Sequence, residues 1–272
     1  MRRQKHIKMK SYKLFGLLLL ACMPLFAQGS ENDSLKILWI GNSYTYYNNL
    51  PAMVTKLAAE QGVKLSPTRF LKGGAHLAGH YKNEKLIEAL KKGGWDYIVM
   101  QEHSSAPAQS TRDVIAETYY YAHLLDSIAM KGSPKAHVIF YMTWGHKNGN
   151  MQNHKHPDPA YPLDETYEDF QTRLKTTYLE LTYENHAWCS PVGMAWQQVR
   201  QKHPEIELYT KDCSHPSKEG SYLAAHCFLS TILQRPYNSH LYFDIPENQA
   251  QALQMAAQNA VFSNMRILGL SK

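Results

Sequence analysis

A short apolar run that breaks off in a Gly-Asn-Ser turn constrains this chain more than any other feature. The run, Ile37 to Ile40, has the length and flanks of a buried strand, and Gly41 permits a sharp turn after it. Apolar residues then recur at helical spacing between Leu50 and Ala58. Ser43 is therefore predicted on a strand-to-helix turn, where a side chain is exposed beside free backbone N–H groups, as a nucleophile requires. Taken alone, these residues also fit an ordinary turn.

A second motif, Asp-x-x-His, lies near the other end of the chain. Asp212 comes three residues before His215, and Ser217 is the predicted N-cap of the helix that follows. At this spacing the carboxylate can bond one ring nitrogen of the imidazole and leave the other nitrogen facing a serine. Asp and His are both common in loops, so the interpretation of this pair depends on Ser43.

Together, the turn at Ser43 and the pair Asp212 and His215 resemble the SGNH/GDSL hydrolase superfamily over about residues 36–235. The resemblance is closest to a secreted bacterial, esterase-like subgroup. Its members carry Gly-Asn-Ser-Tyr/Phe-Thr near the N-terminus and Asp-x-x-His-Pro-Ser near the C-terminus. It implies that Ser43 is the nucleophile, that His215 is its base and that Asp212 orients the base.

The resemblance also implies an oxyanion hole. Its backbone donors are the N–H of Ser43 and that of a glycine after the second strand, Gly74 or the adjacent Gly73. Only a glycine lets the backbone approach the reacting carbon so closely. The superfamily's third donor, an Asn, is missing here. Strand length places His103 at that position, and Gln101 falls on the same face two residues earlier. Both are candidates, with Gln101 preferred because an amide donates at any pH.

Strands and helices alternate along the rest of the chain. Further strands are predicted at 63–71, 95–100, 137–142 and 188–192, and helices at about 84–92, 112–130, 165–185, 194–202 and within 246–268. This alternation predicts an α/β fold, a three-layer α/β/α sandwich around a mainly parallel sheet of about five strands, of the flavodoxin-like type.

Two further residues are candidate substrate contacts. Ligands of such sheets bind at the carboxyl ends of the strands, where Asn42 and Trp144 are predicted to lie. The indole of Trp144 would form a wall against a sugar or an acyl group. A place in the core is an equally good interpretation of this tryptophan.

The first 28 residues are predicted to be a secretory signal peptide, followed by a single hydrolase domain over 29–272. Six Lys or Arg residues precede the apolar run from Leu14 to Ala27, which is short for a membrane span. Without those six cations, 23 basic residues face 23 acidic ones, so a nucleic-acid or anionic-membrane partner loses its main support. Export to the periplasm or outside the cell is expected. A lipoprotein anchored at Cys22 is the less favoured alternative.

No cofactor or metal is expected. The spacing of His146, His154 and His156 matches no closed zinc pattern. The cysteines of the mature chain are Cys189, Cys213 and Cys227. Three cysteines can form at most one disulfide, and the sequence does not identify the pair.

The resemblance implies hydrolysis of an acyl ester through an acyl-enzyme, with acetyl esters of carbohydrates as the expected substrates. The mature chain has no long apolar stretch like a lipase lid, which favours short acyl groups. The α/β-hydrolase type is disfavoured because Thr45 stands where its Gly-x-Ser-x-Gly motif needs a glycine. The alternative is a non-catalytic carbohydrate-binding protein on the same fold.

Overall fold

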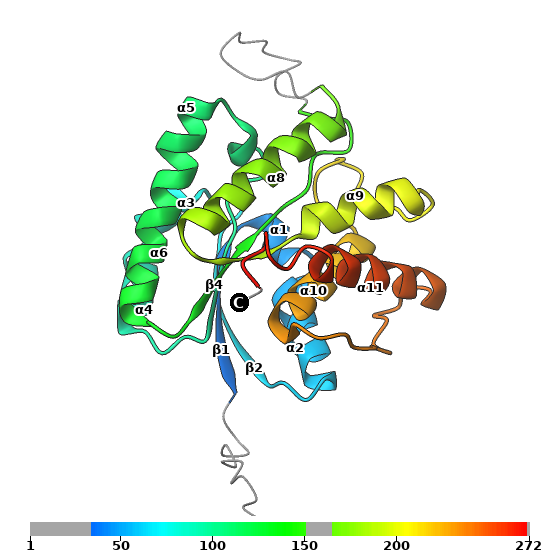
Figure 1. Cartoon of the computed structure of the whole chain (residues 1–272), viewed down its shortest axis with the longest axis horizontal. Coiled ribbons are helices and arrows are strands. Elements are labelled where there is room, and N and C mark those ends of the chain that lie inside the picture. The colour runs from blue at the N-terminus through cyan, green and yellow to red at the C-terminus, as the bar shows by residue number, and fades with distance from the viewer. Residues whose placement is uncertain (1–33, 151–164, 271–272) are drawn as a thin grey trace, which may run out of the picture. The chain divides into compact units, whose positions relative to one another are not determined.

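The computed structural model describes residues 34–150 and 165–270, so the predicted signal peptide, His154 and His156 lie outside the described residues. One sheet of five parallel strands crosses the domain in the order β2-β1-β3-β4-β5 (Figure 1). The strands are β1 (Leu35–Gly41), β2 (Leu65–Leu71), β3 (Tyr97–Met100), β4 (His137–Tyr141) and β5 (Trp188–Ser190). The predicted α/β architecture with a parallel five-stranded sheet is confirmed.

Strand β1 lies inside the sheet, between β2 and β3, and its side chains are apolar on both faces. Residues 37–40 are completely buried, as expected for a parallel strand covered by helices on either side. Strand β2 lies at the edge of the sheet, is only partly buried, and contains Pro67. An edge strand tolerates proline because its outward N–H groups need no partner in the sheet.

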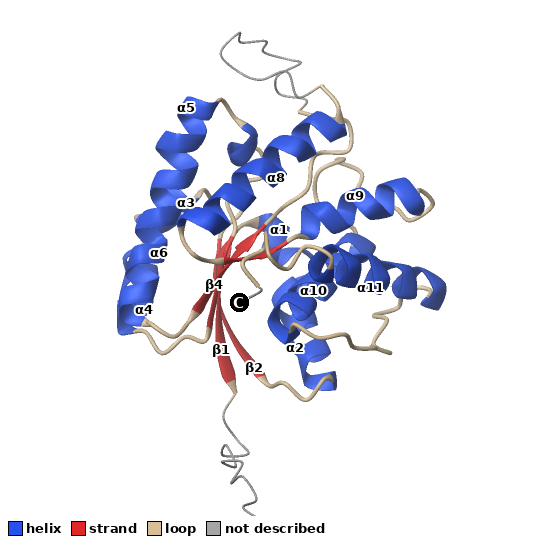
Figure 2. Cartoon of the chain, viewed as in Figure 1, coloured by secondary structure: helices blue, strands red, loops and turns tan. Residues whose placement is uncertain are grey.

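Helices form a layer on each face of the sheet (Figures 1 and 2). One layer consists of α2 (Leu50–Glu60), α9 (Val192–Lys202), α10 (Lys218–Leu233) and α11 (Glu247–Phe262), and α10 contacts the other three. The opposite layer contains α3 (Leu77–Tyr81), α4 (Glu84–Lys92), α6 (Tyr120–Gly132) and α8 (Tyr167–Glu184). Helix α10 is almost entirely buried, so it acts as the core of its layer.

Short elements explain most of the differences from the predicted helices. The predicted helix at 112–130 extends from α5 (Thr111–Asp113) through the π-helical η3 (Val114–Tyr119) into α6, and a short η2 (Ala106–Ala108) precedes it. The helix after Ser43 starts as α1 (Ser43–Tyr46), breaks at η1 (Tyr47–Asn49) and resumes as α2. The break follows from two left-handed residues, Asn48 at φ 49° and Asn49 at φ 54°, a conformation that asparagine tolerates better than most residues.

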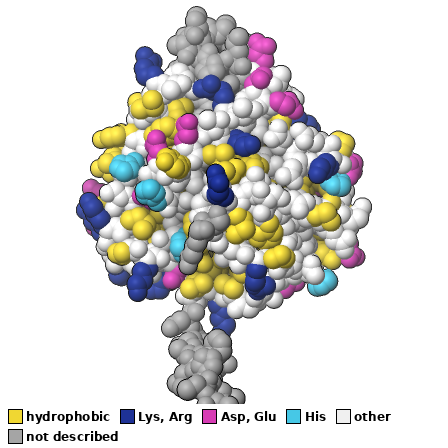
Figure 3. All heavy atoms as spheres, viewed as in Figure 1, with side chains coloured by type: hydrophobic (Ala, Val, Ile, Leu, Met, Phe, Trp, Pro, Cys, Tyr) yellow, Lys and Arg dark blue, Asp and Glu magenta, His cyan; other side chains and the backbone are white. Residues whose placement is uncertain are grey.

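No helix among residues 34–150 and 165–270 is long and apolar enough to cross a membrane. On the face drawn in Figure 3, Lys and Arg side chains are scattered among acidic ones and form no continuous patch.

Candidate active site

The turn after β1 is built so that only glycine fits at its first position. A Cβ on Gly41 would lie 2.7 Å from both Gln101 Oε1 and Thr45 Oγ1. Asn42 then caps α1, its Oδ1 accepting a hydrogen bond from the Tyr44 N–H at 3.1 Å. Ser43 is thereby placed as the first residue of α1, at the carboxyl end of β1.

The loop between α9 and α10 holds the acid and the histidine in one tight turn. Asp212 Oδ1 accepts hydrogen bonds from the N–H groups of Ser214 and His215, each at 2.9 Å, and from Thr210 Oγ1 at 2.8 Å. Ser217 caps α10 as predicted, its hydroxyl accepting from the Gly220 N–H at 3.0 Å. The loop and the start of α10 are therefore fixed together.

Ser43, His215 and Asp212 form one chain of hydrogen bonds. Ser43 Oγ lies 2.8 Å from His215 Nε2, and His215 Nδ1 lies 2.5 Å from Asp212 Oδ2. Since an ionised carboxylate only accepts, Nδ1 carries the proton and Nε2 is free to accept the hydroxyl proton of Ser43. The structure thus brings these three predicted residues within the distance needed for proton transfer.

Asp212 is held in its ionised form. Partial burial alone would raise the pKa of this carboxyl, but the hydrogen bonds from the Ser214 N–H and from His215 outweigh that effect. Together they hold the pKa of Asp212 well below its usual range.

The backbone N–H groups of Ser43 and Gly74 have no acceptor among residues 34–150 and 165–270, and the same holds for the adjacent Gly73. Gly74 lies in the loop after β2 with φ 66°, a conformation that other residues rarely adopt. Both donors were predicted to hold an oxyanion, and both are unoccupied by protein groups.

Comparison with known proteins gives matches only among solved structures, since no family model and no curated protein matches the chain. A chain from Slackia heliotrinireducens proposed to be an SGNH hydrolase is 26% identical, covering 74% of this chain and 100% of that one, with TM-score 0.60. The chain belongs to the SGNH/GDSL hydrolase superfamily.

Two structures of lower sequence identity share the fold of this SGNH/GDSL chain. A DUF4886 family protein from Bacteroides uniformis has TM-score 0.69 at 21% identity, covering 84% of this chain and 95% of that one. An acetyl xylan esterase from Geobacillus stearothermophilus has TM-score 0.51 at 16% identity, covering 77% and 100% respectively.

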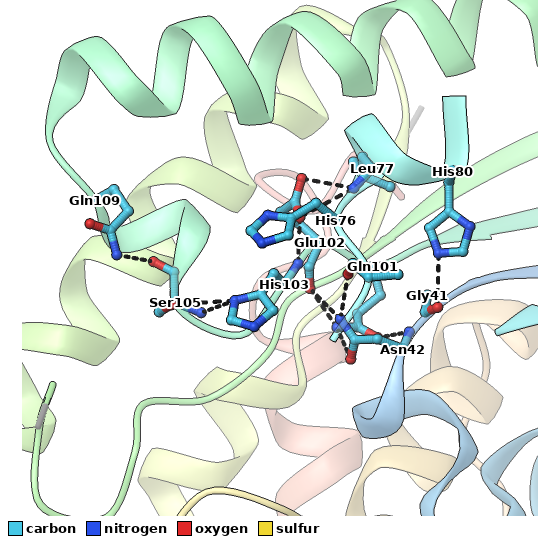
Figure 4. A network of polar contacts seen from close by, with 11 residues as sticks. Gly41, Asn42, His76, Leu77, His80, Gln101, Glu102, His103, Ser105 and Gln109 are labelled. Atoms are coloured by element: carbon cyan, nitrogen blue, oxygen red, sulfur yellow. Dashed lines mark hydrogen bonds and ion pairs between the residues drawn. The ribbon is translucent and has the colours of Figure 1, made fainter. Parts of the chain in front are cut away.

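This SGNH/GDSL chain lacks the Asn donor of the superfamily, and Gln101 does not replace it. Gln101 is fully buried, and its Oε1 accepts from the Asn42 N–H at 3.0 Å and from Thr45 Oγ1 at 2.8 Å. Its Nε2 donates to Asn42 Oδ1 at 2.9 Å and to the Glu102 carbonyl at 2.5 Å (Figure 4). Both amide hydrogens are used, so the structure contradicts the preference for Gln101 and gives it a supporting role beneath the turn.

His103, the other candidate, keeps a ring nitrogen available. The Ser105 N–H donates to His103 Nδ1 at 3.4 Å, so the neutral ring carries its proton on Nε2. Burial, reinforced by the charge of His76, lowers the pKa of His103, which favours this neutral form. His103 therefore has a hydrogen-bond donor to offer at neutral pH.

A buried carboxylate lies beside these groups, and no pattern in the sequence predicted it. Glu102 is 2% exposed and accepts hydrogen bonds from the N–H groups of Leu77 and His103, and His76 Nδ1 lies 3.2 Å from its Oε1 (Figure 4). The bond to Glu102 raises the pKa of His76, whose ring stacks on that of His103 at 4.5 Å. Glu102 thus fixes the loop after β2 against the segment after β3.

A cleft of about 1500 Å³ opens beside this network. Gly74 and His103, two of the candidate oxyanion residues, are among its lining residues. The lining combines apolar surface with polar and charged side chains, among them Arg69, Lys72, His76, Asn83, Gln109 and Glu117. Its wall carries cations, anions and amides, which suits a polar ligand.

The two predicted substrate contacts lie inside the protein instead. Trp144 is fully buried, stacks on Tyr44 at 4.6 Å and donates from Nε1 to the Ser214 carbonyl at 3.0 Å. Asn42 is 2% exposed, and its amide donates to the Ala75 carbonyl at 3.0 Å. The substrate-contact prediction is therefore wrong for both, because each side chain is used to hold the turn or the loop in place.

All three described cysteines, Cys189, Cys213 and Cys227, are free thiols, so no disulfide braces the His215 loop in the described part of the chain. Tyr44 braces it instead, its hydroxyl lying 2.6 Å from Ser214 Oγ. No group of three His, Cys, Asp or Glu side chains in the described ranges is arranged to hold a metal ion.

Proposed function

We propose that this chain is an exported serine esterase that hydrolyses short acyl esters, acetyl esters of carbohydrates above all. The observation that carries the proposal is the hydrogen-bonded chain from Ser43 through His215 to Asp212. Membership of the SGNH/GDSL superfamily supports serine ester hydrolysis as the reaction. The acetyl xylan esterase among the structures of similar fold supports an acetylated carbohydrate as the substrate.

In the proposed reaction, His215 Nε2 takes the proton of Ser43 as Oγ attacks the acyl carbon. Asp212 holds the imidazole in the required tautomer and stabilises its charged form. The oxyanion accepts hydrogen bonds from the N–H groups of Ser43 and Gly74 and from His103 Nε2. His215 then protonates the leaving alcohol, and a water molecule repeats the sequence on the acyl-enzyme.

The polar side chains that line the cleft support a carbohydrate rather than a long acyl chain as the larger part of the substrate. Gly74 and His103 line the cleft, and its walls offer both donors and acceptors, among them Asn83 and Gln109. A long alkyl chain would leave these groups without partners, which costs free energy. Sugar hydroxyl groups would satisfy them.

The proposed function is tested by acetate release from acetylated xylan, compared with hydrolysis of aryl acetate and of aryl palmitate. We expect acetate release, fast cleavage of the acetate ester and little cleavage of the palmitate. Covalent labelling by a fluorophosphonate probe should accompany activity. Binding of xylan oligosaccharides without probe labelling would instead support a non-catalytic carbohydrate-binding protein.

His103→Phe is expected to lower kcat for aryl acetate by roughly a hundredfold, because one oxyanion donor contributes about 3 kcal/mol. The phenyl ring keeps the stacking on His76, so KM and the melting temperature should change little. Steady-state kinetics and thermal denaturation measure these quantities. Unchanged kcat in His103→Phe would show that the third donor lies elsewhere.

Gln101→Ala is the matched comparison for His103→Phe. It leaves the Asn42 N–H and Thr45 Oγ1 without their buried acceptor, at a cost of about 1–3 kcal/mol for each group. We therefore expect its main effect to be a lower melting temperature.

A further inference from the structure

The segment that follows the nucleophile reaches across to the histidine. After α1 the chain breaks at η1, and the Tyr47 ring lies over the His215 imidazole with centroids 4.4 Å apart and planes 20° apart. The buried Tyr44 meets the same imidazole with its edge, at 5.4 Å and 73°. Tyr47 thus covers one face of the proposed base.

The next residue connects the same segment to the loop that carries His215. Asn48 Nδ2 lies within hydrogen-bond distance of the carbonyls of Pro216, at 3.2 Å, and Ser217, at 2.9 Å, and of Ser221 Oγ at 2.9 Å. Its backbone is left-handed, with φ 49°. Asn48 therefore links the turn that bears Ser43 to the loop that bears His215 and to the first turns of α10.

These contacts matter because the imidazole becomes positively charged in the proposed reaction. An aromatic face attracts a cation that lies over it. Of the other titratable groups that interact with His215, Asp212 is ionised, and burial lowers the pKa of His146 to about 4, which leaves it neutral. Burial raises the pKa of Tyr44, which also stays neutral. Tyr47 is thus the aromatic ring stacked on the face of His215, while Asp212 supplies the negative charge at its edge.

We propose that Tyr47 and Asn48 are positioning residues, Asn48 fixing the Ser43–His215 distance and Tyr47 stabilising the imidazolium. The proposal rests on the proposed esterase function for its catalytic consequence. The contact between Tyr47 and His215 is independent of the substrate, so it is testable in the absence of turnover.

The test for Tyr47 is an NMR titration of the His215 ring in the full chain, with the signal assigned by its loss in His215→Gln. In Tyr47→Leu we expect the titration midpoint to move to lower pH by about half a unit to one unit, because the charged form loses its aromatic partner. Tyr47→Phe should keep the wild-type midpoint. Tyr183→Leu, which removes a tyrosine 82% exposed on α8, is the matched control.

Kinetics give a second readout for Tyr47. The acid limb of the kcat/KM profile for aryl acetate should move with the NMR midpoint, and kcat should fall while KM stays constant. An unchanged midpoint in a folded Tyr47→Leu would overturn the role of Tyr47. A wild-type protein that cleaves no ester would refute the proposed function. The NMR midpoints would still show whether Tyr47 stabilises the charged ring of His215.

Asn48 has a matched control next to it in the sequence. Asn48→Gly removes the amide and keeps the left-handed backbone, and Asn49→Gly makes the same change at a residue whose side chain caps nothing. We expect Asn48→Gly to lower kcat roughly ten- to hundredfold with unchanged KM, since a small misplacement of reacting groups has effects of this size. Asn49→Gly should keep wild-type kcat. Equal kcat in both variants would overturn the role of Asn48.

Discussion

Ser43→Ala is expected to lower kcat for aryl acetate by roughly a thousandfold or more. The substitution removes the oxygen that lies 2.8 Å from His215 Nε2, and no acyl-enzyme can form without it. The side chain is small and only partly buried, so the fold should be retained. Initial rates at saturating substrate, together with thermal denaturation, measure the two effects.

Ser66→Ala is the control for this change, because Ser66 is an exposed residue of the edge strand β2. It should keep wild-type turnover and wild-type labelling by a fluorophosphonate. Near-normal turnover by purified Ser43→Ala would refute the assignment of the nucleophile, and with it the proposed mechanism.

Asp212→Asn is expected to lower kcat by roughly a hundred- to ten-thousandfold. Three donors hold Oδ1, so the amide nitrogen would replace Oδ2 and face His215 Nδ1. An amide N–H donates, which forces Nδ1 to accept and puts the ring proton on Nε2, toward Ser43. A ring in that tautomer cannot take the serine proton. Steady-state kinetics across a range of pH measure the loss.

The pH dependence separates this effect from simple acid inactivation. The folded-state pKa of Asp212 lies well below its usual range, so the wild-type carboxylate stays ionised down to well below about pH 4. The deficit of Asp212→Asn should therefore persist at every pH at which both proteins are folded. Asp244→Asn, at an acid 93% exposed, should behave as wild type. Near-wild-type kcat in Asp212→Asn would contradict the proposed role of the carboxylate.

Local sequence patterns correctly predicted those features that depend on residues close together in the sequence. Helix α4 has the predicted bounds of 84–92, and the Asp-x-x-His spacing placed Asp212 correctly for its bond to His215. The last strand ends earlier than predicted, at Ser190 rather than 192. Pro191 explains the difference, because it has no N–H to continue the ladder.

The errors concern contacts between segments far apart in the sequence. Strand β3 pairs directly with β1, which directs the Gln101 amide into the Gly41–Asn42 turn instead of toward a substrate. The side-chain contacts across the paired strands were not predicted. The sequence therefore could not show whether a donor after one strand faces the substrate or supports the turn after the neighbouring strand. Trp144 shows the same limit, since its burial depends on Trp196, against which it stacks at 3.9 Å.

The acid and the base share one short turn, whereas the nucleophile belongs to a different part of the chain. Hydrogen bonds within the turn keep Asp212 and His215 together whatever happens elsewhere. The gap between His215 and Ser43 instead depends on how α10 and its preceding loop rest on α1, η1 and α2. Slight loosening of that helical layer would move Ser43 away from His215 and lower activity while the Asp–His pair remained intact. Substitutions far from the cleft can therefore change turnover through the distance between Ser43 and His215.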